Sequence, residues 1–206
     1  MAGRGVAQNF RLILASASPR RRELLAQAGY TFTVESADVD ESERNNEAPA
    51  AYVKRLAEEK AQAIYARHNP VPEDTLIVLG ADTTVVLDGE ILAKPADAAD
   101  AKRMLRSLSG HTHQVLTGVA VATPTGILSD VETTGVTFLE IPAGELDLYC
   151  ATTEPLDKAG AYGIQGYAAR WIPRIDGDYF NVMGLPIARV VKMIKQAIAD
   201  DPARPR

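Results

Sequence analysis

Two serines and three arginines near the start of the chain could together hold a phosphate. Ser16 and Ser18 precede Pro19, and an arginine run, residues 20–22, follows it directly. Serine is a preferred N-cap and proline a preferred first helical residue, so a helix should begin here with free backbone N–H groups. Cations oppose the dipole at a helix N-terminus, so local stability does not explain the arginines, whereas a bound anion would. The alternative is a solvated basic turn beside an ordinary cap.

Carboxylates that could hold a divalent cation occur at two places in the sequence. Asp40 and Glu41 lie in a polar, acidic loop, residues 38–47. Asp82 follows an apolar run, residues 75–81, which predicts a central strand ending at this aspartate. Phosphate chemistry commonly uses divalent cations, and these prefer carboxylate oxygens. The alternatives are a solvated connection for the loop and a capping or turn role for Asp82.

Lys60 lies on the apolar stripe of a helix predicted over residues 49–67. At about 100° per residue, it is only about 20° from Val53 and Ile64 around the helix. Lysine seldom faces inward without a partner. One interpretation is an ammonium that faces a cleft holding an anion, and the other is an aliphatic stem that reaches the rim of the core.

A glycine-rich loop, residues 155–167, could approach a ligand closely because glycine carries no side chain. Gln165 lies in this loop, and its amide can both donate and accept hydrogen bonds to a base edge. A plain flexible loop is the alternative. His111 and His113 share a face of a predicted strand, but with no further histidine or cysteine nearby a metal site is disfavoured.

The elements that must position these side chains alternate between strand and helix, which predicts an α/β fold. Asp88-Gly89 predicts a hairpin, Asp97 caps a helix, and Pro186 begins the last helix. The remaining elements are predicted as strands over residues 12–14, 31–34, 113–122, 127–140 (one long strand or two), 170–175 and 179–183, and as helices over residues 19–28 and 143–151.

The composition limits the class of protein. A net charge of -5 over 206 residues argues against a broad basic face for nucleic acid. Cys150 is the only cysteine, so a disulfide framework is excluded and a reducing compartment fits. The sequence contains no apolar run long enough to cross a membrane and no signal core, so we expect a cytoplasmic protein. Residues 1–9 and 201–206 are expected to be an extension and a tail on a single domain, residues 1–206.

Five segments that occur together and in order are similar to motifs of the Maf family of nucleoside triphosphate pyrophosphatases. The resemblance covers about residues 12–198. The sequence around Gln165 resembles the branch acting on dTTP and UTP, whereas the branch acting on 7-methyl-GTP carries a glutamate-bearing sequence there. The segments are Ser16-Ala17-Ser18-Pro19-Arg20-Arg21, Gly80-Ala81-Asp82-Thr83, Lys94-Pro95, Ser109-Gly110-His111-Thr112-His113 and Asp157-Lys158-Ala159-Gly160-Ala161-Tyr162-Gly163-Ile164-Gln165-Gly166.

The resemblance implies an inosine-triphosphatase-like (Maf/Ham1) fold, with a mixed β-sheet, flanking helices and two lobes around a cleft. It also implies a homodimer, a divalent cation such as Mg²⁺ or Mn²⁺, and hydrolysis of a nucleoside triphosphate between its α- and β-phosphates. The family is also tied to septum formation. Two alternatives stay open: an enzyme of this family acting on 7-methyl-GTP or another modified nucleotide, and a non-enzymatic regulator of cell division.

Water attack on the α-phosphorus gives each candidate residue a role, since such a transfer needs positioning and charge neutralisation. Asp82 is expected to act as the base or to hold water on the metal. The expected metal holders are Glu41, with Asp40 in support, and Asp82. The expected triphosphate ligands are Arg20, Arg21, Lys60 and Lys94, with hydrogen bonds from Ser16 and Ser18. Gln165 and Thr83 are expected to select the pyrimidine.

Overall fold

A mixed sheet runs the length of the molecule. The computed structural model describes residues 8–69 and 75–200, so most of the predicted extension and all of the predicted tail lie outside the described residues. Within them, seven strands pair in the order β2-β1-β3-β5-β6-β7, with β4 also on β3. β1 is parallel to β2 and β3, and the other pairs are antiparallel. The strands are β1 (Arg11–Ala15), β2 (Thr33–Val34), β3 (Leu76–Leu87), β4 (Glu90–Leu92), β5 (Thr112–Thr123), β6 (Gly126–Thr137) and β7 (Arg174–Asp176).

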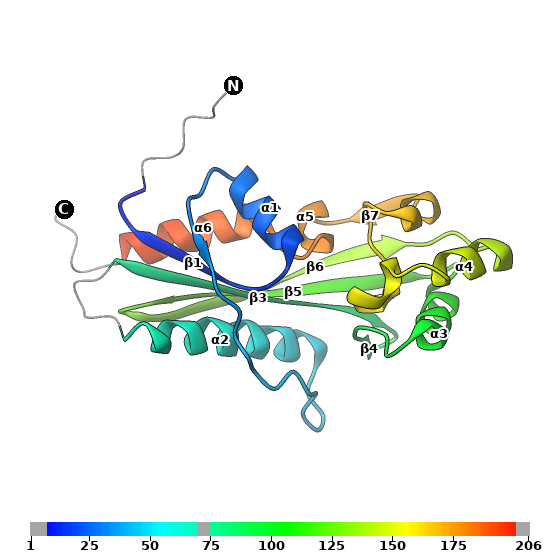
Figure 1. Cartoon of the computed structure of the whole chain (residues 1–206), viewed down its shortest axis with the longest axis horizontal. Helices are drawn as coiled ribbons and strands as arrows, with labels where there is room; N and C mark the ends of the chain where they lie inside the picture. The colour runs from blue at the N-terminus through cyan, green and yellow to red at the C-terminus, as the bar shows by residue number, and fades with distance from the viewer. Residues whose placement is uncertain (1–7, 70–74, 201–206) are drawn as a thin grey trace.

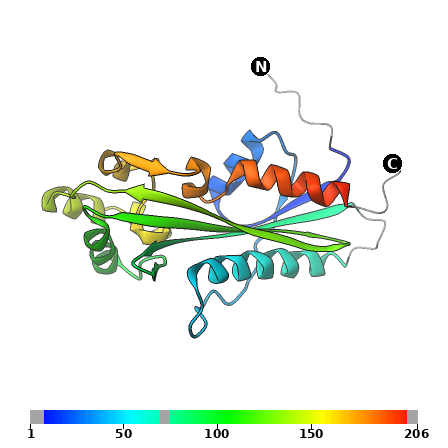
Figure 2. The same ribbon diagram turned by 180° about the vertical axis from the view of Figure 1, so that it is seen from behind.

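Helices cover both faces of this sheet, as the α/β prediction requires. α2 packs on one face, and α1 and α6 pack on the other (Figures 1 and 2). At the end away from the two termini, α3, α4 and three short 3₁₀ segments build a second lobe around its own apolar core. The helices are α1 (Pro19–Gln27), α2 (Pro49–Arg67), α3 (Ala98–Leu108), α4 (Ala143–Cys150), α5 (Tyr179–Val182) and α6 (Ile187–Ala199), and the 3₁₀ segments are η1 (Glu154–Asp157), η2 (Ala159–Ala161) and η3 (Tyr167–Trp171).

The predicted helix caps are confirmed because caps depend on local sequence. The Ser18 side chain accepts a hydrogen bond from the Arg21 backbone N–H, and Pro19 is the first residue of α1. Asp97 accepts from the Asp100 N–H at the start of α3. Each cap satisfies a backbone donor that would otherwise be unpaired, which stabilises the helix by about 1 kcal/mol.

Two glycines let α2 lie directly on the sheet. A Cβ added at Gly80 of β3 would clash with the backbone carbonyl of Ala57, and one added at Gly118 of β5 would clash with the carbonyl of Val53. Side chains at either position would force the helix away from the strands. Because they are absent, α2 approaches β3 closely enough for Lys60 to reach that strand.

β3 is longer than predicted, and the prediction that it ends at Asp82 is wrong. It pairs with β5 without interruption past Asp82, which lies opposite Gly118. On its other edge, β3 pairs with β1 only as far as Gly80, and with β4 only from Val85 onward. Among the described strands, residues 81–84 therefore have a neighbour on one side only, and we call them the open edge of β3.

The predicted strands over residues 170–175 and 179–183 are also corrected. Residues up to Trp171 belong to η3, and β7 begins only at Arg174. Residues 179–182 form the short helix α5, because Asp178 caps it by accepting a hydrogen bond from the Phe180 N–H. The aromatic and branched residues of this segment favour a strand locally, but the cap decides in favour of a helix.

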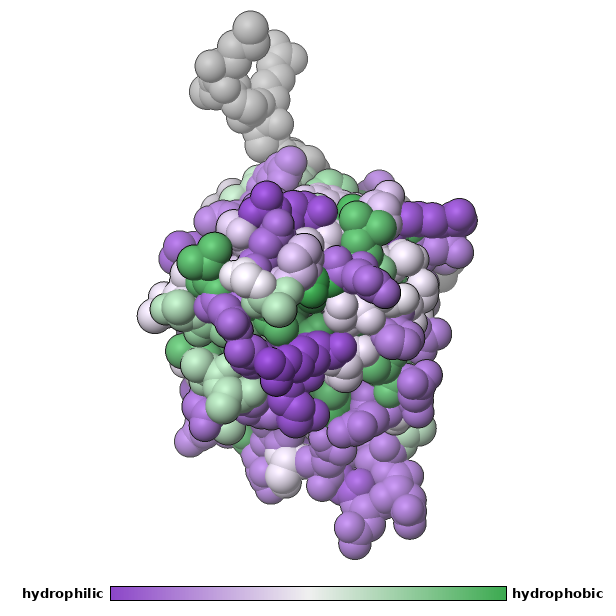
Figure 3. Space-filling view, turned by 90° about the vertical axis from the view of Figure 1, so that its right-hand side faces the viewer, coloured by the Kyte–Doolittle hydropathy of each residue, from purple (hydrophilic) through white to green (hydrophobic). Residues whose placement is uncertain are grey.

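The end of the molecule formed by α3 and α4 has a mixed surface (Figure 3). Apolar side chains lie scattered among hydrophilic ones on this face. Leu139 and Leu148 are among the large apolar side chains exposed here. None of the helices in the described ranges 8–69 and 75–200 has the length and apolar character needed to cross a membrane.

Candidate active site

A cleft of about 900 Å³ opens at the open edge of β3, between the two lobes. One wall is the N-terminus of α1, the floor is formed by α2 and β3, and the other wall is the glycine-rich loop. Of the predicted site residues, only Asp40 is missing from the lining. Those present are Ser16, Ser18, Arg20, Arg21, Glu41, Lys60, Asp82, Thr83, Lys94 and Gln165.

Lys60 lies between two carboxylates on the cleft floor. Its Nζ is 2.7 Å from Asp82 Oδ1 and 2.6 Å from Glu41 Oε1, and the residue is only 8% exposed. Burial alone would raise the pKa of Glu41, but the hydrogen bond and charge of Lys60 hold that pKa below its usual value. Helical periodicity is compatible with a lysine that faces inward or one that reaches the rim, and the structure places Lys60 inward.

Asp40 points elsewhere, although it is next to Glu41 in the sequence. Its Oδ1 accepts a hydrogen bond from the Ser42 N–H, which lowers the pKa of its carboxyl group. The side chain is exposed and turned into its own loop. Asp40 thus shapes the loop that carries Glu41, whose backbone carbonyl accepts a hydrogen bond from the Tyr52 hydroxyl at 2.9 Å.

Arg21 is committed to protein oxygens. Its guanidinium donates to Gly184 O at 2.8 Å, Ala81 O at 2.9 Å, Thr83 Oγ1 at 2.9 Å and Ser16 Oγ at 3.2 Å. These bonds use four of its five N–H groups. Burial lowers the pKa of this guanidinium, though nearby carboxylates oppose the effect. Arg21 therefore ties α1 to the open edge and adds positive charge beneath the cleft.

The freer cations are Arg20 and Lys94. Neither forms an ion pair within residues 8–69 and 75–200, and both line the cleft. Arg20 lies across from the glycine-rich loop, since its Nη1 is 3.5 Å from where a Cβ would stand on Gly163. Two unpaired cations facing a shared space suit an anion with several negative charges. Arg22 is exposed and does not line the cleft.

Thr83 and Asp82 project to opposite faces of β3. The Thr83 hydroxyl is 2.9 Å from Thr117 Oγ1 and accepts from Arg21, on the face covered by α6. Asp82 faces α2. Because β1 has already ended, both residues remain accessible from the open edge, and the cleft reaches them from the side of the sheet.

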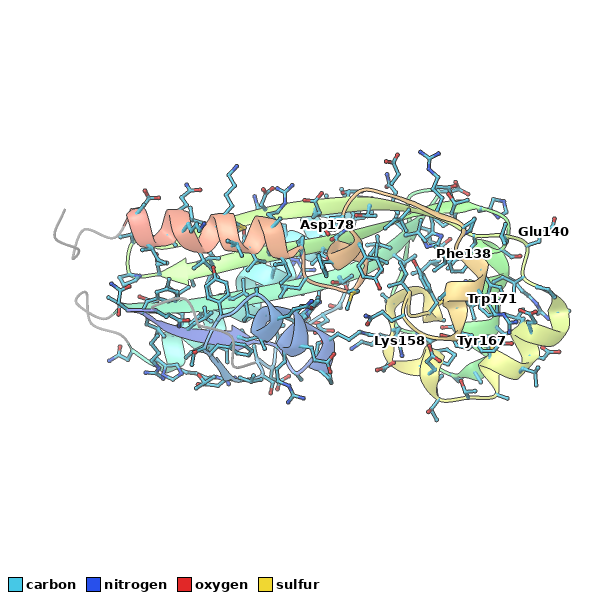
Figure 4. All side chains as sticks on the ribbon, turned by 90° about the horizontal axis from the view of Figure 1, so that it is seen from above. Phe138, Glu140, Lys158, Tyr167, Trp171 and Asp178 are labelled. Atoms are coloured by element: carbon cyan, nitrogen blue, oxygen red, sulfur yellow. The ribbon has the colours of Figure 1, made fainter. Side chains whose placement is uncertain are left out.

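The loop that carries Gln165 is held by residues that the sequence analysis did not single out. The Tyr149 hydroxyl donates to Glu154 Oε1 at 3.2 Å, and the carboxylate of Glu154 occupies the space that a side chain at position 166 would need. The Lys158 ammonium binds the Glu154 carbonyl oxygen. Tyr167 and Trp171 lie in the same lobe, and Lys158 lies on its side toward α1 (Figure 4). The sequence signal for this contact is the position of Glu154, a carboxylate directly before the glycine-rich loop.

His113 belongs to the core of the second lobe. Its Nε2 is 2.8 Å from the Tyr162 hydroxyl, and its ring packs edge-on against Phe138. Burial lowers the pKa of His113 to about 4. Among the described residues, no group of three or more histidine, cysteine or acidic side chains could hold a metal ion. His113 is therefore part of the core, whereas His111 is exposed.

The fold and cleft define an α/β protein whose site suits a multiply charged anion. A family model described as Maf-like protein matches residues 11–197, so this chain belongs to the Maf family.

Curated relatives cover most of the chain. The dTTP/UTP pyrophosphatase of Koribacter versatilis (strain Ellin345) is 55% identical over 90% of this chain and 94% of its own. The protein of the same name from Symbiobacterium thermophilum is 52% identical, and the match covers 90% of this chain and 93% of that protein. A solved nucleoside-triphosphatase, a dITP/XTP pyrophosphatase from Mycobacterium abscessus, covers 92% of this chain and 98% of its own, with 17% identity and a TM-score of 0.47. That likeness supports no conclusion about activity.

Proposed function

We propose that this protein is an enzyme that hydrolyses dTTP and UTP to the nucleoside monophosphate and pyrophosphate. The observation that carries the proposal is the ion-paired cluster of Lys60, Asp82 and Glu41 on the floor of a cleft whose walls carry the cations Arg20 and Lys94. The printed activity of the relatives, at about half identity over most of the chain, supports the choice of substrate.

Asp82 is the group we assign to the reacting water. Its Oδ1 is held by Lys60, and its position in the middle of a paired strand fixes the carboxylate firmly. A carboxylate fixed in this way can orient a water molecule and accept its proton as the oxygen attacks the α-phosphorus. The bond between the α-phosphorus and the oxygen that bridges it to the β-phosphorus then breaks, and pyrophosphate leaves.

The cations divide the remaining work. Arg20 and Lys94 contact the triphosphate directly, because their side chains are unpaired within the described part of the chain and line the cleft. Lys60 stabilises the negative charge that develops beside Asp82. Arg21 adds positive charge beneath the cleft, and its hydrogen bonds hold the side chains of Ser16 and Thr83 in place. Ser18 and the N-terminus of α1 complete the phosphate site.

Glu41 and Asp82 would hold a divalent cation through the carboxylate oxygens that do not contact Lys60. Both offer carboxylate oxygens, and Lys60 already holds the two groups close together. Mg²⁺ usually takes one or two protein carboxylates and completes its octahedron with water and phosphate oxygens. Bound there, Mg²⁺ or Mn²⁺ would neutralise phosphate oxygens and lower the pKa of bound water. Asp40 has only an indirect part, since its side chain points into its own loop.

The test measures pyrophosphate release from dTTP, UTP, CTP, ATP, GTP and 7-methyl-GTP in the presence of Mg²⁺ or Mn²⁺. We expect dTTP and UTP to be hydrolysed well ahead of the purine nucleotides, and the Gln165→Glu variant to narrow that gap. Preferential hydrolysis of 7-methyl-GTP would overturn the choice of substrate. Binding of nucleotides without any release of pyrophosphate would support the non-enzymatic regulator instead.

We further propose a homodimer in the cytoplasm, as the resemblance to the Maf family implies. The exposed Leu139 and Leu148 provide apolar surface at one end of the molecule. The free, buried thiol of Cys150 fits a reducing compartment. Sedimentation equilibrium of the full chain decides the oligomeric state, and a single species with the mass of one chain would exclude the dimer.

A further inference from the structure

The carboxylate of Glu154 is held at the wall of the cleft beside Gln165. One oxygen accepts a hydrogen bond from the Tyr149 hydroxyl, which is itself buried in the core of the second lobe. The carboxylate lies against the Cα of Gly166, where no other residue type leaves room for it. Both Glu154 and Gln165 line the cleft. The position of this acid is thus fixed by three parts of the chain: α4, η1 and the glycine-rich loop.

This carboxylate keeps unused capacity to accept hydrogen bonds. An ionised carboxylate offers about four acceptor positions. The ammonium of Lys158 binds the Glu154 backbone carbonyl and not the side chain. Within residues 8–69 and 75–200, no lysine, arginine or histidine forms an ion pair with the carboxylate of Glu154. The group therefore faces the cleft as an acceptor for a donor that a ligand must supply.

We infer that Glu154 selects the base by accepting a hydrogen bond from the ring N3–H of thymine or uracil. This inference rests on the proposed function, because it concerns the base end of the same substrate. Thymine and uracil carry a donor at N3 next to the C4 carbonyl, whereas cytosine carries an acceptor at N3. Gln165 supplies the donor for the C4 carbonyl, and Glu154 supplies the acceptor for N3–H. The pair excludes cytosine because two acceptors would then face each other.

The test separates base selection from hydrolysis by measuring binding. Calorimetry compares the affinities of α,β-imido-dUTP and α,β-imido-dCTP for the wild type and for Glu154→Gln. The carboxamide can turn its N–H₂ group toward cytosine N3, so we expect this variant to narrow the uracil preference by about tenfold or more, the usual value of one buried hydrogen bond. Pyrophosphate release from dTTP is measured separately, so loss of that activity in the wild type would count against the proposed function alone.

Two control variants keep the result interpretable. Glu140→Gln removes a glutamate that is exposed at the outer end of the same lobe, away from the cleft, and should leave the preference unchanged (Figure 4). Tyr149→Phe removes the hydroxyl that donates to Glu154 and accepts from the Gly163 backbone, and it should weaken the preference by less than Glu154→Gln does. A Glu154→Gln protein with the wild-type ratio of affinities, or one that loses both nucleotides equally, would overturn the inference.

Discussion

Lys60 is the side chain for which charge and burial conflict most. Its ammonium is nearly buried, and ion pairs with the two carboxylates compensate for the cost of burying the charge. Replacing it would remove the hydrogen bond and the charge that hold down the pKa of Glu41, so that pKa should rise. The lysine therefore sets the charge state of the cleft floor.

Lys60→Met should fold and lose most of its activity. The methionine side chain fills a similar volume on the apolar stripe, so we expect a thermal midpoint close to the wild type. Loss of the cation should lower kcat/KM for dTTP by on the order of 100-fold, the typical cost of removing a charge that stabilises a transition state. Lys54→Met, at an exposed position of the same helix, serves as the control. Unchanged kcat/KM would remove Lys60 from the mechanism.

The two carboxylates should respond differently to added metal. Asp82→Asn keeps the shape but loses the base, so turnover should fall steeply while nucleotide binding persists. Glu41→Gln should instead raise the metal concentration needed for half-maximal activity, because its loop position makes it the more adaptable ligand. A titration of kcat with Mg²⁺ and Mn²⁺ for both variants, with calorimetry of nucleotide binding, makes the comparison. Rescue of Asp82→Asn by excess metal, without rescue of Glu41→Gln, would reverse the two assignments.

At the scale of elements, the close contact between α2 and β3 sets the geometry of the site. Lys60 and Asp82 come from different elements, and their 2.7 Å hydrogen bond depends on the helix lying directly on the strand. Gly80 makes that contact possible two residues before Asp82. The packing of a helix therefore determines the distance between Lys60 and Asp82.

Gly80→Ala should damage both stability and activity. The added methyl group clashes with the backbone of α2, and overpacking of this kind costs about 1–3 kcal/mol. We expect the free energy of unfolding in urea to fall by that amount and kcat to fall with it. Gly144→Ala is the matched control: nothing lies within 4 Å of its added Cβ, and alanine is the better helix former in α4. Equal effects of the two substitutions would contradict this account of α2.

The core of the second lobe should weaken in acid because His113 is buried in its neutral form. Its pKa is lowered to about 4 in the folded protein, from an ordinary value of 6.5. Between these values the unfolded chain binds a proton that the folded chain does not, so stability is lost as the pH falls from about 6.5 towards 4. The full shift corresponds to roughly 3 kcal/mol.

Urea denaturation across this pH range, with an NMR titration of the imidazole, measures the effect of His113. The control replaces the exposed His111 by glutamine. This substitution should not change how steeply the free energy of unfolding depends on pH. A His113 resonance that titrates near pH 6.5 in the folded protein would contradict the prediction.

At the scale of the whole molecule, the sequence predicted what depends on near neighbours. Ser18, Pro19 and Asp97 were placed correctly because caps act within one turn. Lys60 was placed on the apolar stripe of its helix because helical periodicity is local, although whether it faced inward was left open. The continuation of β3 through Asp82 was missed, since pairing with a distant strand overrides the polar residues there. The contact of Tyr149 with Glu154 was missed because it depends on the packing of two irregular segments. A single domain over residues 1–206 stays a prediction.

The open edge of β3 also bears on how the protein avoids association with itself. An unpaired strand edge is a template on which another chain can add a strand, the first step of many aggregates. Here the gap spans only residues 81–84, and β1 and β4 occupy the same edge on either side of it. A typical strand of about five or six residues does not fit between them. The gap admits a small ligand to the backbone of the sheet and denies the same access to a neighbouring polypeptide.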